Sequence, residues 1–271
     1  MKKKILALAI AAIMVVTALA SISLAYLMDS DYDKNTMTVG NVKIEQIEQR
    51  RVINDDGSID GTALETYAND QKLLPAVYPN GKGTLAYDNT ITLDNGNTQK
   101  IWDETVNNEI DKIVTVTNTG TESAFIRTIF AFEDKELDGG QFITNKIHTL
   151  WNASDAVEAN AVVWPKDDNG KNIWITVDGV NYTICVYTYK APVAAGATTN
   201  PSLVQLFLDP TADNSFMEHI GAQYDILVLS QAVQSAGFET LGAEIALNEA
   251  FGEVSVANAA EVEKWFVNAT N

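Results

Sequence analysis

The sequence predicts a mainly β protein folded as an antiparallel β sandwich. About eight short segments combine β-branched and aromatic residues with apolar–polar alternation, and turn residues separate them at spacings typical of a sandwich. Helical spacing of apolar residues appears near the C-terminus, so short helices should follow the β body. The chain has 271 residues and one cysteine, and a chain of this length buries an adequate core without a disulfide.

The N-terminus has the layout of a signal peptide. Three lysines at positions 2–4 precede an uncharged stretch over 5–28, and a small-x-small pattern ends at Ala25. We expect residues 1–25 to be removed by cleavage between Ala25 and Tyr26, with a second small-x-small site five residues upstream in reserve. Because 24 uncharged residues are also enough to span a bilayer, an uncleaved anchor is the alternative. Either outcome places the rest of the chain outside the cytoplasm.

The first part of the mature chain gives weaker signals. A strand is expected to begin near Met37, and alternation at 42–45 supports it. Residues 54–61 form an Asn, Asp and Gly turn cluster, and a short helix is expected over 62–72. The region 79–108 shows little periodicity apart from alternation just before Asn95-Gly96, which favours an irregular loop or a hairpin.

The strongest β signal lies in the middle of the chain. An apolar segment at 113–116 precedes the turn 118–121, and the run 124–132 follows it, so two strands joined by a hairpin are expected. Further strands are expected over residues 161–164, 173–177, 182–189, 203–208 and 225–233.

Two helices are expected after these strands. Apolar residues fall near helical spacing over 238–251, and Gly252 stands where a helix is expected to stop. A second helix can begin at Asn258, an acceptable N-cap, with Glu261 as its capping-box partner.

The charge of the chain excludes some partners. The whole chain has a formal net charge of −18, and residues 1–25 contain three lysines and no acid. The mature chain therefore keeps 15 basic and 36 acidic residues, a net charge of −21. Such a protein repels nucleic acid and anionic lipid, and its acidity keeps an exported protein soluble.

No constellation of residues for catalysis is found, so the chain is not expected to be an enzyme. The two histidines, His148 and His219, form no His-Glu-x-x-His motif, and each is expected to be structural or exposed. Cys185 lies in an alternating strand and is expected to be a buried, inert thiol. Three acidic turns, one of them at 167–170, lack the ligand spacing of an EF-hand. No cofactor or metal site is expected, and weak calcium binding is left as an alternative.

Three parts of the sequence resemble a known family. Residues 24–27 (Leu-Ala-Tyr-Leu) and 33–44 (Asp-Lys-Asn-Thr-Met-Thr-Val-Gly-Asn-Val-Lys-Ile) are similar to the start of proteins processed by a SipW-type signal peptidase. Residues 114–127 resemble the strand–turn–strand element of TasA-like biofilm matrix proteins and the camelysin group, in which an Asn-x-Gly turn precedes a small residue and an Arg. Residues 231–234 and 246–252 resemble the BsaA branch of clostridia-like, Gram-positive bacteria.

The resemblance implies a jelly-roll-like β sandwich over residues 48–271, whose subunits assemble into extracellular matrix fibres. Residues 26–47 are then an N-terminal donor strand that adds to the next subunit, because an added strand satisfies the backbone groups of an open sheet edge. The side chains expected to form this assembly strand are Met37, Val39, Val42, Ile44 and Ile47. The implied partners are further copies of the chain, accessory matrix proteins and the SipW-type signal peptidase, and not nucleic acid.

Two alternatives stay open at this point. Residues 37–47 can instead pair within their own chain as an ordinary first strand. The chain can also be a monomeric cell-surface binding module, retained by an uncleaved N-terminal helix, that presents sandwich loops to carbohydrate, host protein or calcium. The function expected from the resemblance is a secreted structural subunit that acts by non-covalent self-association.

Overall fold

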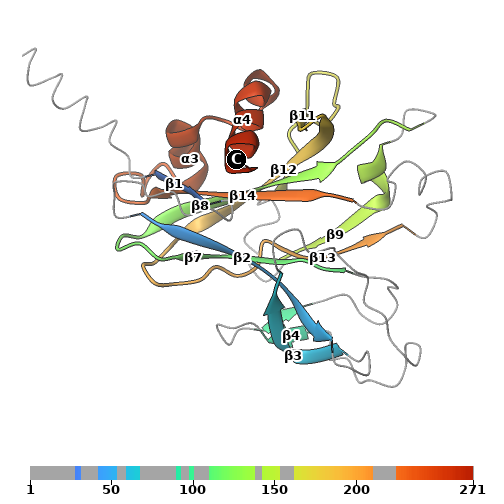
Figure 1. The fold of residues 1–271 in the computed structure, drawn as a ribbon. Helices are drawn as coiled ribbons and strands as arrows, with labels where there is room; N and C mark the ends of the chain where they lie inside the picture. Colours follow the sequence, from blue (N-terminus) through green and yellow to red (C-terminus); the bar gives the residue numbers. More distant parts are fainter. Residues whose placement is uncertain are drawn as a thin grey trace, which may run out of the picture.

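The structure is a computed structural model. It describes residues 28–31, 42–53, 59–67, 90–92, 98–100, 110–137, 142–152, 162–209 and 224–270. Within these residues the protein is mainly β, with antiparallel strands in two packed layers and helices at the C-terminal end (Figure 1). The predicted fold class, an antiparallel β sandwich with C-terminal helices, is confirmed.

The first layer is a six-stranded antiparallel sheet. Its strands are β1 (Met28–Asp31), β14 (Ile226–Gln234), β8 (Ala124–Glu133), β12 (Val180–Val193), β10 (Val162–Val163) and β11 (Trp174–Val177). β8 lies at the centre between β14 and β12, and β1 pairs with the other side of β14. β10 and β11 both pair with β12.

The second layer combines two short sheets. Its strands are β3 (Ile59–Thr66), β2 (Ile44–Ile53), β7 (Ile113–Asn118), β6 (Ile110–Asp111), β13 (Leu203–Leu208) and β9 (Ile147–Trp151), paired in the orders β3-β2-β7 and β6-β13-β9. Backbone bonds join the two sheets, because Lys112 N donates to Val204 O at 3.0 Å and Ser202 N donates to Val114 O at 2.9 Å. β7 therefore lies between β2 and the segment that leads into β13.

β8 shows why the six-stranded sheet has two buried faces. Successive side chains of a strand point to opposite faces. Ile126 and Phe130 point into the core between the two layers, whereas Ile129 and Ala131 pack on the outer side. We call the cluster between the layers the main core; its buried residues are Val42, Ile44, Val114, Val116, Ala124, Ile126, Phe130, Phe132, Cys185, Tyr187, Tyr189, Leu203, Leu206, Val228 and Ala232.

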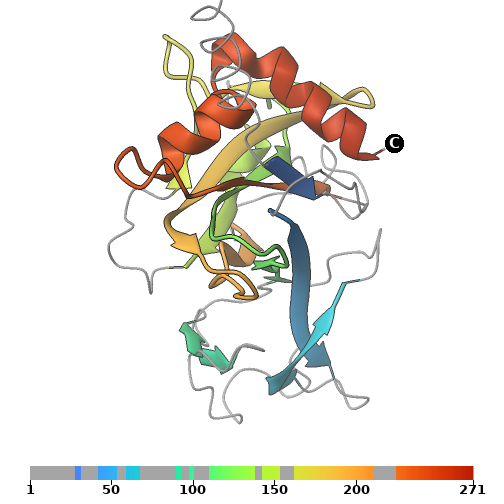
Figure 2. The same ribbon diagram turned by 90° about the vertical axis from the view of Figure 1, so that its left-hand side faces the viewer.

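Two helices cover the outer face of this sheet (Figures 1 and 2). They are α3 (Ala243–Phe251) and α4 (Ala259–Thr270), and the short 3-10 helix η2 (Val256–Asn258) lies between them. Leu247 of α3 packs in a cluster with Phe125 of β8, and Phe266 of α4 packs with Ile129. Both predicted helices are confirmed, although α3 begins at Ala243. The two residues of the predicted capping box make other bonds: the Asn258 amide donates to Glu253 O at 3.0 Å, and Glu261 Oε2 accepts from Lys264 Nζ at 2.9 Å.

The predicted hairpin at 113–132 is wrong. Its two strands exist as β7 and β8, but they belong to different layers. Both edges of β8 are already paired, with β12 and β14, so no edge is left for β7. The Asn118 side chain shapes the crossing between layers: it donates to Glu122 O at 2.8 Å and Val193 O at 2.9 Å, and it accepts from Gly120 N at 3.0 Å.

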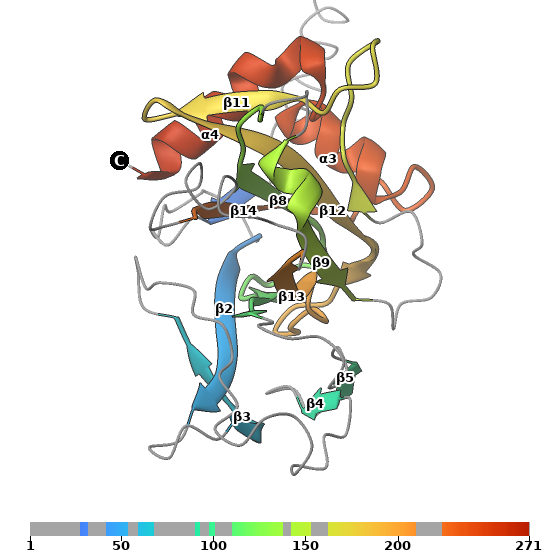
Figure 3. The ribbon, with the colours of Figure 1, turned by 90° about the vertical axis from the view of Figure 1, so that its right-hand side faces the viewer.

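The helix predicted over 62–72 is also wrong where the structure describes it. Residues 59–66 form β3, which pairs antiparallel with β2; pairing with a neighbouring strand has overridden a weak local signal. Of the two alternatives for 79–108, an irregular loop or a hairpin, the hairpin is found around Asn95-Gly96, with β4 (Thr90–Thr92) paired to β5 (Thr98–Lys100). This hairpin lies with β3 at the end of the molecule farthest from the helices (Figure 3).

The strands predicted from residue 161 onward are confirmed with shifts at their ends. The strand expected to begin near Met37 is described only from Ile44, as β2, and residues 37–41 lie outside the described residues. The segment predicted at 203–208 is β13 without change, and the one predicted at 182–189 is the longer β12. One further 3-10 helix, η1 (Ile143–Lys146), precedes β9.

Candidate assembly site

β1 places the first described residues at an edge of the six-stranded sheet. It pairs antiparallel with β14, from Met28 opposite Val233 to Asp31 opposite Ser230. Within the described ranges, β14 is the only strand that pairs with it. The pairing satisfies backbone groups of β14 that would otherwise form an open edge. An N-terminal segment thus covers a sheet edge, which is the interaction that a donor strand makes.

The predicted assembly residues divide into two groups. Val42 and Ile44 are buried in the main core, at 1% and 2% exposure, and Ile47 is half-buried in β2. The rest lie outside the described residues: Met37, Val39 and the predicted cleavage pair Ala25 and Tyr26. In a single chain, residues 42–44 therefore fill their own core and β2 pairs with β7, which is the intrachain pairing that the sequence left open.

β2 changes its pairing partner at Gln49. Residues 44–49 pair with β7, and residues 49–53 pair with β3. The first backbone bond on the β3 side comes one residue earlier, where Tyr67 N donates to Glu48 O at 2.8 Å. The predicted end of the donor segment at Ile47 falls inside β2, immediately before this change of partner.

Gln46 connects the first half of β2 to the six-stranded sheet. Its side-chain oxygen accepts from Ser230 Oγ at 2.7 Å, and its side-chain nitrogen donates to Val228 O at 3.4 Å and to Glu48 Oε1 at 3.0 Å. Ser230 Oγ also lies 3.0 Å from Thr128 Oγ1. Buried polar groups are stable only when their partners are in place, so these bonds fix the position of β2 above the sheet.

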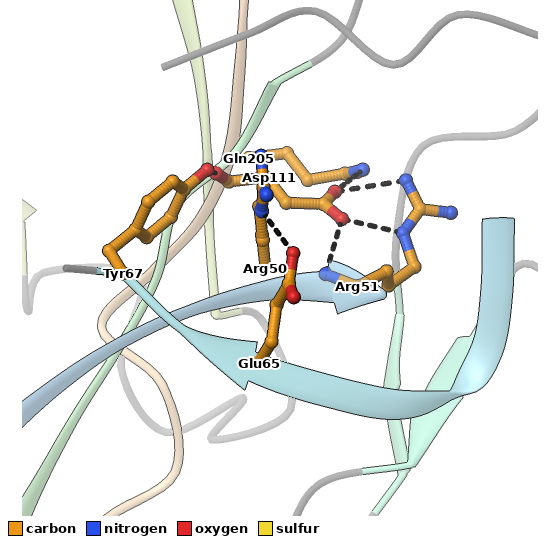
Figure 4. Close-up of polar contacts among 6 residues, drawn as sticks. All are labelled: Arg50, Arg51, Glu65, Tyr67, Asp111 and Gln205. Atoms are coloured by element: carbon orange, nitrogen blue, oxygen red, sulfur yellow. Dashed lines mark hydrogen bonds and ion pairs between the residues drawn. The ribbon is translucent and has the colours of Figure 1, made fainter. Parts of the chain in front are cut away.

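A buried charge pair holds the second half of β2 (Figure 4). Arg51 Nε and Nη2 donate to the two carboxylate oxygens of Asp111 at 2.7 and 2.9 Å, and Arg51 N donates to Oδ2 at 3.1 Å. Gln205 Nε2 donates to Asp111 Oδ1 at 2.8 Å. The three residues come from β2, β6 and β13, and their exposures are 2%, 8% and 0%. We call Arg51, Asp111 and Gln205 the β2 clasp.

Tyr67 extends the polar contacts around the clasp. Its hydroxyl donates to Asp111 O at 2.7 Å, and its ring centroid lies 5.6 Å from Arg50 Cζ and 5.7 Å from Lys112 Nζ. Burial raises the pKa of the Tyr67 hydroxyl far above its usual value, and the negative charge of Asp111 acts in the same direction. Arg50 also pairs with Glu65 at 2.5 Å, which joins β2 to β3 (Figure 4).

The sequence prediction missed the β2 clasp. Arg51 and Asp111 are 60 residues apart, so no local spacing links them. The only available signal was a charged residue directly before the apolar pair Val52-Ile53, since a charge inside a strand requires a partner when it is buried.

A second buried cation brings together the segments that carry the family resemblance. Arg127 is 2% exposed, and it donates to Gln231 Oε1 at 2.8 Å, Asn248 Oδ1 at 2.9 Å and Gly252 O at 2.9 Å. Its Cζ also lies 5.5 Å from the Trp265 ring. Burial lowers the pKa of Arg127 to about 10, so the side chain stays protonated at neutral pH. Arg127 therefore fastens the end of α3 to the six-stranded sheet.

The residues considered for other chemistry lie apart from one another. Cys185 is fully buried, and burial raises the pKa of its thiol, so the predicted buried thiol is confirmed. His148 is exposed, lies 2.8 Å from Asp209 and stacks on Phe207. His219 lies outside the described residues.

The acidic turn at 167–170 is closed by its own backbone. Asp167 Oδ1 accepts from Asn169 N at 2.8 Å and from Lys171 N at 2.9 Å. The bond from Lys171 N is the largest cause of the lowered pKa of Asp167. Among the residues that the structure describes, no group of three or more His, Cys, Asp or Glu side chains is placed to hold a metal ion.

Comparisons of the chain with family models, with curated proteins and with solved structures find no match. The family resemblance therefore rests on the three parts of the sequence given above, and the function that it implies is a proposal. Over the described residues, no helix is both long enough and apolar enough to cross a membrane.

Proposed function

We propose that this chain is a secreted structural subunit of extracellular biofilm matrix fibres. Each subunit assembles non-covalently by donating its N-terminal β strand to the next copy. The observation that carries the proposal is the position of the N-terminal strands: β1 covers a sheet edge, and Val42 and Ile44 of the next segment fill the main core. The signal-peptide pattern and the resemblance to SipW-dependent matrix proteins supply the cellular setting.

The burial of Val42 and Ile44 gives the exchange a driving force. Burying one such side chain stabilises the folded protein by about 1.5–3 kcal/mol. A subunit whose core lacks Val42 and Ile44 is therefore stabilised when the same side chains of another copy fill the core. A second copy of the chain supplies the same two side chains on the same N-terminal segment. The contacts within one chain and between chains are then equivalent, and a high subunit concentration favours the polymer.

The proposal is tested by separating donor from acceptor. The mature chain 26–271 is compared with a chain that starts at 49, and a synthetic peptide of residues 26–48 is added to each. The readouts are size-exclusion chromatography and negative-stain microscopy. Chain 26–271 should form fibres, chain 49–271 should not, and the peptide should bind chain 49–271 one to one.

Adding the peptide to the intact chain 26–271 gives a second test, which does not depend on whether chain 49–271 folds. In excess it should cap growing ends and shorten the fibres of 26–271. A control peptide with Val42→Asp and Ile44→Asp should have no such effect. Folded monomers of 26–271 at every concentration, with or without peptide, would contradict the proposal.

A specific pocket favours the second candidate, a monomeric surface module retained by an uncleaved N-terminal helix. A cavity of about 190 Å³ lies beside Phe142 and Trp174, whose rings meet edge to face at 5.3 Å. Asp134, Glu136 and Lys171 also line it. Aromatic walls with polar groups are suited to a small polar ligand such as a sugar. This candidate predicts a membrane-bound monomer with an intact N-terminus whose sugar binding is lost in Trp174→Ala.

A further inference from the structure

We infer that the segment 42–53, which contains β2, is divided at Glu48 into an exchangeable part, residues 42–47, and a fixed part, residues 49–53. We also infer that β7 of a second copy receives the exchangeable part. The inference rests on the proposed function, because it says which residues of the N-terminal segment leave their own chain. Glu48 is then the hinge between the exchangeable part and the fixed part.

The fixed part is held by charge and by pairing. Arg51 has its guanidinium and its backbone N–H on Asp111, inside a site from which water is excluded. Moving Arg51 away leaves two buried charges without compensation, which is strongly unfavourable. Pairing with β3 adds backbone bonds along the edge of β2 that faces away from β7. This part of β2 therefore stays with its own subunit.

The exchangeable part is held by interactions that another copy can reproduce. Ile44 lies opposite Asn118 and Ile47 lies opposite Thr115, so its backbone pairing within the sheet is with β7 alone. Val42 and Ile44 pack with Val116 in the main core, and Gln46 bonds to Ser230 Oγ and Val228 O of β14, contacts that the same side chains of a second copy can make. The exchangeable part contains no buried charge. Its departure from the main core therefore exposes apolar surface but leaves no buried ion without a partner.

Glu48 lies where the two parts meet. Its carbonyl accepts from Tyr67 N on the β3 side, and its carboxylate pairs with Lys112, which directly precedes β7. A rotation of the backbone on the N-terminal side of Glu48 breaks the β7 pairing of residues 44–47, whereas Glu48 and Gln49 keep their β7 pairing and the β3 pairing is kept. The hinge is thus at a point where the backbone partner changes, and a few such residues are enough to absorb a large change of direction.

Two engineered disulfides test this division. Glu45 lies opposite Thr117 across β2 and β7, and Arg50 lies opposite Glu65 across β2 and β3. Directly opposed residues of an antiparallel pair have the Cα separation that a disulfide needs. The variants are E45C with T117C, the β7 lock, and R50C with E65C, the β3 lock. Cys185 is fully buried and does not compete.

The two locks should behave differently in chain 26–271. The oxidised β7 lock should give no fibres, and reduction should restore them to the level of the unlinked chain. The oxidised β3 lock should give fibres in normal amount. Fibres from the oxidised β7 lock, or their loss with the β3 lock alone, would overturn the inference.

Hydrogen exchange on the monomer provides a test that does not depend on fibres. Amides of 44–47 should be at least about tenfold less protected than amides of 50–53, because the first part opens locally. Asp111→Asn should reduce the protection of 50–53 and leave that of 44–47 unchanged. Equal protection of the two parts contradicts the hinge, whereas an absence of fibres from the unlinked chain contradicts the proposed function instead.

Discussion

Replacing Asp111 by alanine should destabilise the protein by about 3–5 kcal/mol, the cost of removing one partner of a buried ion pair. Four donated hydrogen bonds end on its carboxylate, three from Arg51 and one from Gln205. Arg51 is 2% exposed and Gln205 is fully buried, so water cannot replace the lost acceptor. The variant therefore leaves a buried cation without a counter-charge.

Two companion variants separate this charge effect from loss of packing. Arg51→Met combined with Asp111→Leu removes both charges and keeps apolar volume, and such replacements are often neutral or stabilising. The double variant should recover most of the lost stability. Arg50→Gln removes the partly exposed pair with Glu65, whose side chains are 18% and 41% exposed, and should cost less than about 1 kcal/mol.

The assay is urea unfolding of chain 26–271, followed by tryptophan fluorescence below the concentration at which fibres form. Free energies of unfolding come from the midpoint and slope of each curve. If Asp111→Ala costs less than about 1 kcal/mol, or if the double variant is as unstable as Asp111→Ala, then the clasp does not fix β2 and the reasoning is refuted.

Three further predictions concern other parts of the fold. Arg127→Met should cost at least about 2 kcal/mol in urea unfolding, because it leaves the buried acceptor Gln231 Oε1 without its Arg127 donor; an unchanged midpoint would show that α3 is held by packing alone. Cys185 should react with a thiol reagent only at the rate of unfolding, since its thiol is buried and its pKa is raised; fast reaction of the native protein would contradict this. The raised pKa of Tyr67 means that its contribution to stability is present below its ordinary value of about 10 and is lost as the pH rises above it. Tyr67→Phe should therefore be less stable than the parent at pH 8, and the difference should narrow above pH 10; a constant difference would contradict the shift.

Local patterns were sufficient for much of the fold. The run 124–132 is apolar at nearly every position, and the structure makes it the central strand β8, buried on both faces. The spacing over 238–251 predicted a helix, and α3 occupies most of that range. The side chains within each of these segments determine its secondary structure, so the pattern of one segment at a time was enough to predict it.

Long-range pairing accounts for what the sequence did not predict. β7 and β8 are neighbours in sequence, but their partners come from β2, β12 and β14. Residues 62–66 join a strand because β2 is available beside them. The clasp joins Arg51, Asp111 and Gln205, each more than 50 residues from the next, and no spacing rule reaches across such separations.

The proposed hinge is another feature that appears only in three dimensions. The sequence suggested that a donor segment ends at Ile47, on the basis of a family resemblance. The structure adds a physical reason for a boundary close to that point, since the backbone partner of β2 changes at Gln49 and the buried charge begins at Arg51.

The most direct test of strand donation is a disulfide that can form only between chains. A chain carrying Glu45→Cys is mixed with a chain carrying Thr117→Cys, allowed to assemble and then oxidised, and the products are separated by non-reducing electrophoresis. Donation predicts a dimer that contains one chain of each kind, because Glu45 of one copy then lies opposite Thr117 of the next in the parent fibre. A parallel mixture of Arg50→Cys and Glu65→Cys chains should give no mixed dimer. Fibres that yield no mixed dimer from the Glu45→Cys and Thr117→Cys chains would contradict assembly by exchange of the N-terminal strand.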